Sequence, residues 1–402
     1  MTVVKSANVT SANVGDPINK IGYKNGIVTG LVISALGCFL FLPAAHWQVY
    51  GLFLGALFCL GIGFTLLQIA ANPYVAILGV PDTASSRLNL VQAFNSFGTT
   101  IGPLIGGYLI FEYFVGDHIQ GADAVRIPYI VFGSIFVALA ALFSFIKLPD
   151  FLNQEEIEKG LGALRYPQLV LGMLAIFMYV GSEVTVGSLL INYFALPEVA
   201  GLEKSTGDIF LAFYWGGAMI GRFVGSISLG KMPDSRKLVL MAFAALGGFM
   251  VVYLAGYIKS GFSLEFGQAA PFLILIVLNF LAFRVGQSQA GLTLGFFAVV
   301  NLVLLLVTIS TQGTLAFWSV IGIGLFNSIM WSNIFTLAIA GLGKYTSQGS
   351  SLLVMAILGG ALIPLLQGTM ADSAGLKRSF IVPMIGYAYL CFYGFKGSKY
   401  KV

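Results

Sequence analysis

The feature that most constrains this chain is a succession of apolar stretches, each about as long as a lipid bilayer is thick. A helix needs roughly 20 apolar residues to cross the hydrocarbon core. Irregular backbone cannot face lipid, because its polar groups would lack hydrogen-bond partners. The sequence therefore predicts an all-α polytopic membrane protein of about 12 spans, at 26–42, 49–79, 88–113, 127–147, 168–196, 207–230, 238–258, 271–284, 291–309, 315–341, 349–370 and 379–395.

The composition agrees with this fold class and excludes several functions. Hydrophobic residues make up 58% of the chain and charged residues 9%, against roughly 25% charge in soluble domains. The net charge of +5 is spread over short loops, so we expect no nucleic-acid partner. The three cysteines, Cys38, Cys59 and Cys391, lie in apolar stretches without ligand spacing. Neither a disulfide framework nor a metal site is predicted, and no cofactor is expected.

The positive charges are unequally divided between the two sides of the predicted membrane. With the N-terminus inside, the inside loops hold fifteen lysines and arginines and the outside loops hold five, which leaves Arg222 within a span. Loops rich in lysine and arginine stay in the cytoplasm. Both termini are therefore predicted to be cytoplasmic.

Two neighbouring stretches carry amides where lipid would favour leucine. Gln68 and Asn72 are four residues apart and share one helical face, while Gln92 and Asn95 fall on one half of the next helix. A buried amide without partners costs on the order of a few kcal/mol, so these faces must look at protein or at a polar cavity. A single amide is equally well explained as a packing contact between membrane helices. Four amides from two adjacent helices favour a site for a small molecule rich in hydroxyls.

One acidic residue, Glu183, lies near the middle of the predicted span 168–196. Ionisable residues inside a span are functional candidates by default, and scarce water disfavours the charged carboxylate, which suits a proton carrier. The alternative is a structural carboxyl bonded to a neighbouring hydroxyl or to Arg222. Arg222 lies near a span end, where snorkelling to the interface explains it as well as substrate contact does.

An aromatic ring and an amide share a face on the predicted span 315–341. These residues are Trp331 and Asn327. Such a pair suits a sugar, because the ring stacks on C–H faces while the amide bonds to hydroxyls. Trp331 would alternatively belong to an interfacial aromatic belt, although its mid-span position argues against that.

The same amide-bearing region carries a family resemblance. ANPYVAILG at 71–79, followed by RLNLVQAFNSFGTTIGP at 87–103, resembles the signature of the fucose–galactose–glucose:proton symporters, a branch of the major facilitator superfamily. GLFNSIM at 324–330 is similar to the family's second-half binding helix. The resemblance implies two helical bundles with the substrate between them. It also implies import of a neutral hexose (glucose, galactose or L-fucose) by proton symport across a bacterial inner membrane.

The halves of the chain depart from this family pattern in opposite directions. Two spans precede the basic loop Lys231–Lys237 but none precedes its counterpart Lys20–Lys24, so the N-terminal bundle is expected to be incomplete. The alternative is a native N-terminal tail.

The second half carries two additional spans. The predicted division is a cytoplasmic segment 1–25, a four-span bundle 26–147, a cytoplasmic linker 148–167, an eight-span bundle 168–395 and a cytoplasmic tail 396–402.

The resemblance assigns roles to some of these residues. Amides on the family's fifth helix contact sugar, which implies Gln92 and Asn95 here. Some fucose-transporting members have an acid where this chain has Gln68, which cannot carry a proton, so the glucose/galactose branch is closer and Glu183 is the candidate for proton coupling. We expect a monomer whose partners are a hexose, protons and lipid. An enzyme is not predicted, since His46 and His118 lie in short loops without an acidic partner. The competing function is a transport-inactive sugar-binding or scaffolding membrane protein.

Overall fold

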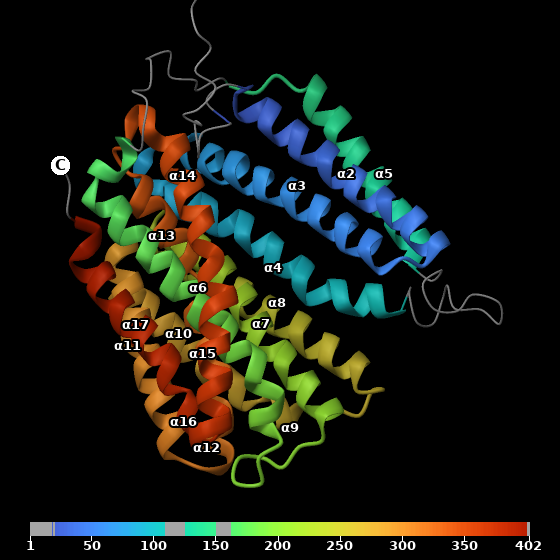
Figure 1. The fold of residues 1–402 in the computed structure, drawn as a ribbon. Coiled ribbons are helices and arrows are strands. Elements are labelled where there is room, and N and C mark those ends of the chain that lie inside the picture. The colour runs from blue at the N-terminus through green and yellow to red at the C-terminus, as the bar shows by residue number, and fades with distance from the viewer. Residues whose placement is uncertain (1–17, 19–20, 109–124, 150–161, 400–402) are drawn as a thin grey trace, which may run out of the picture. The chain divides into compact units, whose positions relative to one another are not determined.

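The computed structural model describes residues 18, 21–108, 125–149 and 162–399 (Figure 1). Most of the predicted segment 1–25 and linker 148–167, the end of the tail 396–402, and His118 lie outside these residues. Every regular element in the described part is helical, which confirms the predicted fold class. The long helices are α2 (Tyr23–Trp47), α3 (Tyr50–Ile77), α4 (Ala84–Tyr108), α5 (Arg126–Phe145), α6 (Pro167–Phe194), α7 (Lys204–Ser228), α8 (Asp234–Lys259), α10 (Pro271–Val285), α11 (Ala290–Ser310), α12 (Gly313–Asn327), α13 (Met330–Ile339), α14 (Thr346–Met355), α15 (Gly359–Ala374) and α17 (Ile381–Phe395).

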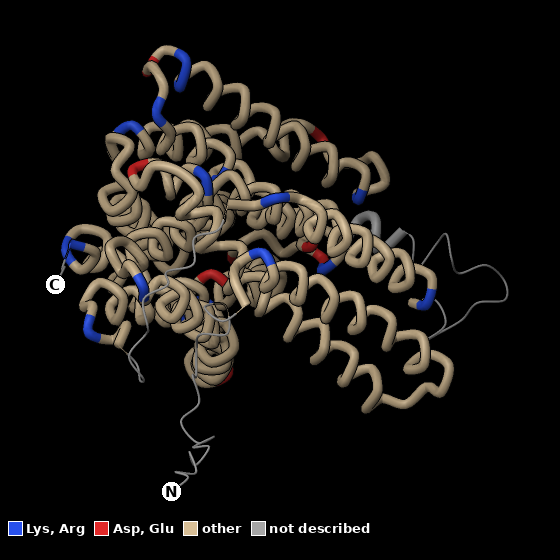
Figure 2. Tube along the Cα trace, turned by 90° about the horizontal axis from the view of Figure 1, so that it is seen from above, with Lys and Arg blue, Asp and Glu red and all other residues tan. Residues whose placement is uncertain are grey.

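Each of the twelve predicted stretches coincides with one of these helices or, at 315–341 and 349–370, with two, and 109–113 of the third stretch lies outside the described residues. Within the described residues, 10 helical segments are long and apolar enough to cross a membrane. The two short helices α9 (Phe266–Ala269) and α16 (Leu376–Ser379) precede α10 and α17. Charged residues lie mainly at helix ends and in loops (Figure 2). The number of spans, and the missing and additional pairs, stay predictions.

The described contacts divide the chain into two compact units. Unit 1 comprises Met1–Tyr74, Phe114–Tyr166 and Gly341–Val354, and unit 2 comprises Val75–Tyr113, Pro167–Ala340 and Met355–Val402. Unit 1 therefore holds α2, most of α3, α5 and α14, whereas unit 2 holds α4 with α6 to α13 and α15 to α17. The predicted bundle boundaries place α4 with the first half and stay a prediction.

Unit 1 is held together mainly by apolar packing. A Cβ on Gly37 of α2 would lie 2.6 Å from the backbone nitrogen of Leu60 in α3, so the glycine permits a close helix–helix approach. The rings of Phe41 and Tyr129 stack with centroids 3.7 Å apart and join α2 to α5. At one end of the same pair, the Lys24 ammonium donates to the Ser144 carbonyl at 2.8 Å.

Unit 2 is built around α7, which packs on α4, α8 and α12. Glycines allow these close approaches: a Cβ on Gly324 of α12 would collide with the Tyr214 carbonyl, and one on Gly221 of α7 would collide with the Ser328 hydroxyl. Helix α6 packs on α13, α15 and α17 (Figure 1). The backbone of α7 therefore lies close to the segment where α12 ends.

The predicted span 315–341 is interrupted in its middle. Helix α12 ends at Asn327 and α13 begins at Met330. Side chains from other helices bond the nearby carbonyls: the Tyr179 hydroxyl donates to Asn327 O at 3.1 Å and Arg222 Nε to Ser328 O at 3.0 Å. The Asn279 amide donates to Leu325 O at 3.2 Å. A break buried in protein is tolerated at membrane depth because its backbone groups find such partners.

Candidate functional site

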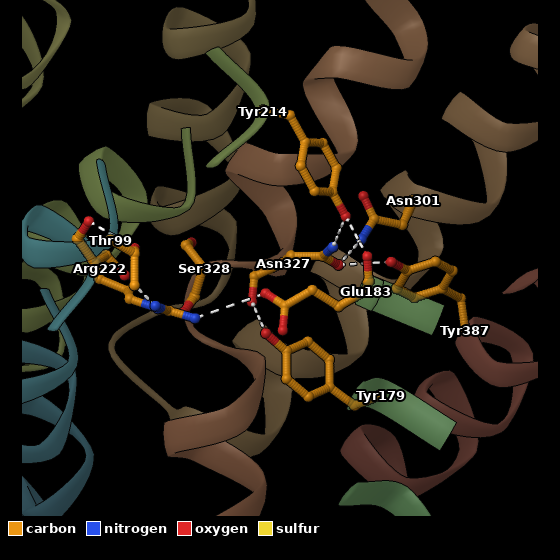
Figure 3. A network of polar contacts seen from close by, with 10 residues as sticks. Thr99, Tyr179, Glu183, Tyr214, Arg222, Asn301, Asn327, Ser328 and Tyr387 are labelled. Atoms are coloured by element: carbon orange, nitrogen blue, oxygen red, sulfur yellow. Dashed lines mark hydrogen bonds and ion pairs between the residues drawn. The ribbon is translucent and has the colours of Figure 1, made fainter. Parts of the chain in front are cut away.

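The carboxylate of Glu183 lies inside unit 2 beside an arginine. Glu183 is 8% exposed and shares the face of α6 with Tyr179 and Gly187. Its Oε1 lies 3.6 Å from Arg222 Nη2 of α7 (Figure 3). This separation is an ion-pair distance but longer than a charge-assisted hydrogen bond, which measures about 2.7–2.9 Å. The acid is therefore buried with a countercharge that does not bond it directly.

Arg222 points into unit 2 and is held by three elements. Besides Glu183 of α6, its Nε donates to the Ser328 carbonyl at the helix break, and its Nη1 donates to the Ser96 hydroxyl of α4. Its side chain is 12% exposed. The sequence left open whether the Arg222 side chain extends to the membrane interface. In the structure it is directed into unit 2 instead.

A second group of polar side chains centres on Asn327. Its Oδ1 accepts from Tyr387 at 2.7 Å and from Asn301 at 2.9 Å, and its Nδ2 donates to the Tyr214 hydroxyl at 3.0 Å. Tyr214 in turn donates to the Glu183 backbone carbonyl at 2.9 Å (Figure 3). The amide is thus engaged within the protein, and it ties α7, α11, α12 and α17 to the segment of α6 that carries Glu183.

A cavity of about 470 Å³ lies between α4, α6, α7 and α8. Such a volume falls in the usual range for small-molecule sites, roughly 300–1,000 Å³. An ion pair between Lys259 and Asp208 joins α8 to α7 at its wall. The lining residues are Asn95, Ser96, Thr99, Thr100, Glu183, Asp208, Leu211, Ala212, Trp215, Arg222, Ala255 and Lys259.

The structure brings together only some of the residues that the sequence singled out. Asn95 and Glu183 line the cavity. Asn327 and Trp331 are not among its lining residues: Asn327 is fully buried, and Trp331 is 9% exposed and stacks on a neighbouring ring. Gln92 of α4 is half-buried. The sugar-site assignment of these residues stays a prediction.

Gln68 and Asn72 belong to α3 in unit 1. The Gln68 side chain is exposed, and Asn72 is buried with 5% exposure. Although they are four residues apart, these two amides therefore differ in exposure to solvent.

Sequence reasoning placed Thr99 on the polar half of α4 with Asn95, but it missed Trp215, Ser96 and Thr100. Trp215 lies against α6, where a Cβ on Gly187 would be 2.8 Å from its ring. Thr99 and Thr100 both donate to the Ser96 carbonyl, at 2.9 Å and 2.8 Å. The only sequence signal for Trp215 was Gly187, on the face of α6 that carries Glu183. A glycine leaves room for a side chain from another helix but does not identify that side chain.

This cavity offers an aromatic face, hydroxyls, an amide and a buried carboxylate–guanidinium pair. Rings stack on the C–H faces of sugars, and hydroxyls and amides exchange hydrogen bonds with neutral hydroxyl groups. A carboxylate of low exposure is also a group that can take up and release a proton. The site is therefore suited to a neutral polyhydroxylated molecule and to proton transfer.

Comparison with known proteins gives consistent matches. Residues 13–301 match the profile of the Major Facilitator Superfamily. A glucose/galactose transporter of Brucella abortus is 43% identical over 97% of this chain and 82% of its own. An L-fucose-proton symporter of Escherichia coli is 28% identical over 92% of this chain and 77% of its own. A crystal structure of the E. coli fucose:proton symporter aligns with a TM-score of 0.72 and 26% identity, covering 94% of this chain and 84% of that one.

Proposed function

Because the chain belongs to the fucose–galactose–glucose:proton symporter family of the Major Facilitator Superfamily, we propose that it imports a neutral hexose together with protons. The observation that carries this proposal is the cavity, whose wall combines Asn95, Thr99 and Trp215 with the Glu183–Arg222 pair. The glucose/galactose branch is favoured, since the relative at 43% identity carries that name and position 68 is an amide.

In this proposal the sugar lies against Trp215 and exchanges hydrogen bonds with Asn95 and Thr99. The remaining amides and ring predicted from the sequence, Gln68, Asn72, Gln92, Asn327 and Trp331, belong to the proposed site as residues that meet the sugar during the transport cycle. Alternating access in this fold moves helices around a fixed site. Residues away from the cavity here are therefore compatible with contact in another state.

Glu183 is the proposed proton carrier. Its burial, its ion pair with Arg222 and its place at the cavity wall support the assignment. A carboxylate in this position is accessible from the cavity, and its charge is balanced by a group on another helix. Protonation therefore changes the net charge inside unit 2 at the point where the sugar is proposed to bind.

The proposed cellular setting is a bacterial inner membrane, with both termini in the cytoplasm and the chain acting as a monomer. The distribution of lysines and arginines between loops supports this orientation. The bacterial origin of the matched relatives supports the membrane.

Reconstituted protein tests the function directly. Proteoliposomes should show counterflow of radiolabelled glucose or galactose, and an inwardly directed proton gradient should drive accumulation. Glu183→Gln should keep binding and counterflow but lose accumulation, because exchange needs no net proton movement whereas accumulation does. Glu203→Gln, which changes an exposed acid before α7, is the matched control.

Two outcomes would contradict this proposal. Sugar binding without counterflow would favour the sugar-binding or scaffolding alternative. Accumulation by Glu183→Gln equal to that of the parent protein would show that the proton is carried elsewhere.

A further inference from the structure

Arg222 connects the proposed proton site to the sugar-binding face of α4. Its guanidinium faces Glu183 of α6 with one nitrogen (Figure 3). Another nitrogen donates to Ser96 of α4. The third nitrogen is held by the Ser328 carbonyl at the break between α12 and α13. One side chain thus touches the proton site, the helix that carries Asn95, and a fixed backbone anchor.

The contacts of Arg222 with Glu183 and with Ser96 are made by two nitrogens of one guanidinium, so a shift of that group toward one partner moves it relative to the other. At 3.6 Å, Glu183 attracts it without a direct hydrogen bond, and Glu183 Oε1 has no hydrogen-bond partner among the described residues. A charged carboxylate draws the guanidinium toward α6, since a hydrogen bond to a charged partner is stronger than one to a neutral hydroxyl. A protonated carboxyl exerts no such attraction and leaves the guanidinium on Ser96.

The Ser96 contact acts on residues that line the cavity. Asn95 precedes Ser96 directly, and the hydroxyls of Thr99 and Thr100 both donate to its carbonyl. A guanidinium that holds Ser96 therefore also fixes the orientation of this cavity-lining turn of α4. Loss of that bond would remove this restraint on the turn that carries Asn95.

We propose that Arg222 is a positioning residue that transmits the protonation of Glu183 to α4 through Ser96, so that the protein binds sugar more tightly when Glu183 is protonated. The inference rests on the proposed function. In this proposal α4 couples protonation to sugar affinity through Ser96, in addition to binding sugar through its amides.

Among the described side chains, Glu183 has a single cationic partner. The ionisable side chains facing it are Arg222 and Tyr214 from α7, Tyr387 from α17 and Tyr179 from α6 itself. The other helices packed on α6 in the described structure, α12, α13 and α15, bring no ion-pair partner to it. Arg222 is therefore the cation whose position responds to the carboxylate.

The test is the pH dependence of the sugar dissociation constant, measured by equilibrium binding of radiolabelled glucose and galactose from about pH 5.5 to about pH 8. In the parent protein affinity should fall as pH rises. Glu183→Gln should bind tightly at every pH. Ser96→Ala should lose about fivefold in affinity at low pH and show a flat profile, because one hydrogen bond is removed.

The double variant Glu183→Gln/Ser96→Ala should bind weakly at every pH, because position 183 is then uncharged at every pH but the hydrogen bond from Arg222 to α4 is missing. Ser226→Ala is the matched control, because the hydroxyl of this buried serine of α7 donates within its own helix, to the Phe223 carbonyl. Arg222→Lys should also flatten the profile, since an ammonium cannot bond Ser96 and Ser328 with the same fork. Melting temperatures exclude loss of fold.

A parent-like pH profile in Ser96→Ala, together with a flat profile in Glu183→Gln, would overturn this inference and leave the proposed function intact. A pH-dependent profile retained in Glu183→Gln would instead contradict the role of Glu183 as proton carrier.

Discussion

The two units of this protein differ in what joins their helices. In unit 1 the contacts between α2, α3 and α5 are mainly apolar, as in the Phe41–Tyr129 stack and the approach of Gly37 to Leu60. In unit 2 the helices are joined by buried polar groups centred on Glu183, Arg222 and Asn327 (Figure 3). Polar groups within a membrane are expensive and are retained where function needs them. Apolar packing therefore suffices to hold unit 1 together, whereas unit 2 contains the buried polar groups to which proton coupling is assigned by proposal.

Removal of one charge of the buried pair in unit 2 is expected to have the largest effect. Arg222→Gln should destabilise unit 2 by about 3 kcal/mol, because loss of one partner leaves the other buried without compensation. Thermal unfolding in detergent measures the effect. The double variant Glu183→Gln/Arg222→Gln should recover part of the loss. An Arg222→Gln protein as stable as the parent would mean that the polar contacts do not hold unit 2 together.

The corresponding change in unit 1 is steric. Gly37→Ala should cost about 2 kcal/mol, because the new Cβ would lie 2.6 Å from the backbone of Leu60, and overpacking of this kind forces helices apart. Gly55→Ala in α3 is the control, since nothing lies within 4 Å of its Cβ position. Thermal unfolding of both variants in the same detergent gives the comparison. Equal melting temperatures would show that α2 and α3 do not depend on close contact.

Sugar affinity is expected to depend on one amide from each unit. Asn95→Ala in unit 2 should weaken hexose binding by about 1 kcal/mol, since it removes a hydrogen bond to a neutral hydroxyl. Gln68→Ala in unit 1 should weaken it similarly, as the proposed site includes both amides. Equilibrium binding measures each dissociation constant. An unchanged value in Gln68→Ala alone would confine the site to unit 2, and unchanged values in both would remove the assignment.

The smallest expected effect concerns the surface of unit 2. The hydrogen bond from Lys231, and secondarily its charge, lower the pKa of Asp82 in the loop before α4. A lowered folded-state pKa adds stability above the unfolded value of about 3.9, and that stability is lost as pH falls through the folded pKa. The melting temperatures of the parent and Asp82→Asn should therefore converge between about pH 6 and about pH 3. Because the pair is exposed, salt should reduce the difference. A constant difference across this range would contradict the pairing.

The helices were predictable from the sequence, but the polar contacts between them were not. Apolar length indicated where helices lie, and the period of α4 placed Asn95 on the face opposite Leu90 and Phe94, an assignment that stays a prediction. The interruption after Asn327 escaped detection because the residues on both sides remain apolar. The partners of Arg222 come from α4, α6 and the helix break, and no local pattern relates residues so far apart in the chain. For the same reason the ring expected beside the amide on α12 and α13 was Trp331, whereas the ring at the cavity wall is Trp215.

The interruption between α12 and α13 also has a consequence for biogenesis. Carbonyls near it are bonded by Tyr179 of α6, Arg222 of α7 and Asn279 of α10, all of which are synthesised earlier. When the ribosome delivers this segment to the bilayer, its donors are therefore already present, and it can enter lipid beside them. Shuffling α6 or α7 to a position after this segment should lower its insertion efficiency, even though no residue of the segment itself has changed.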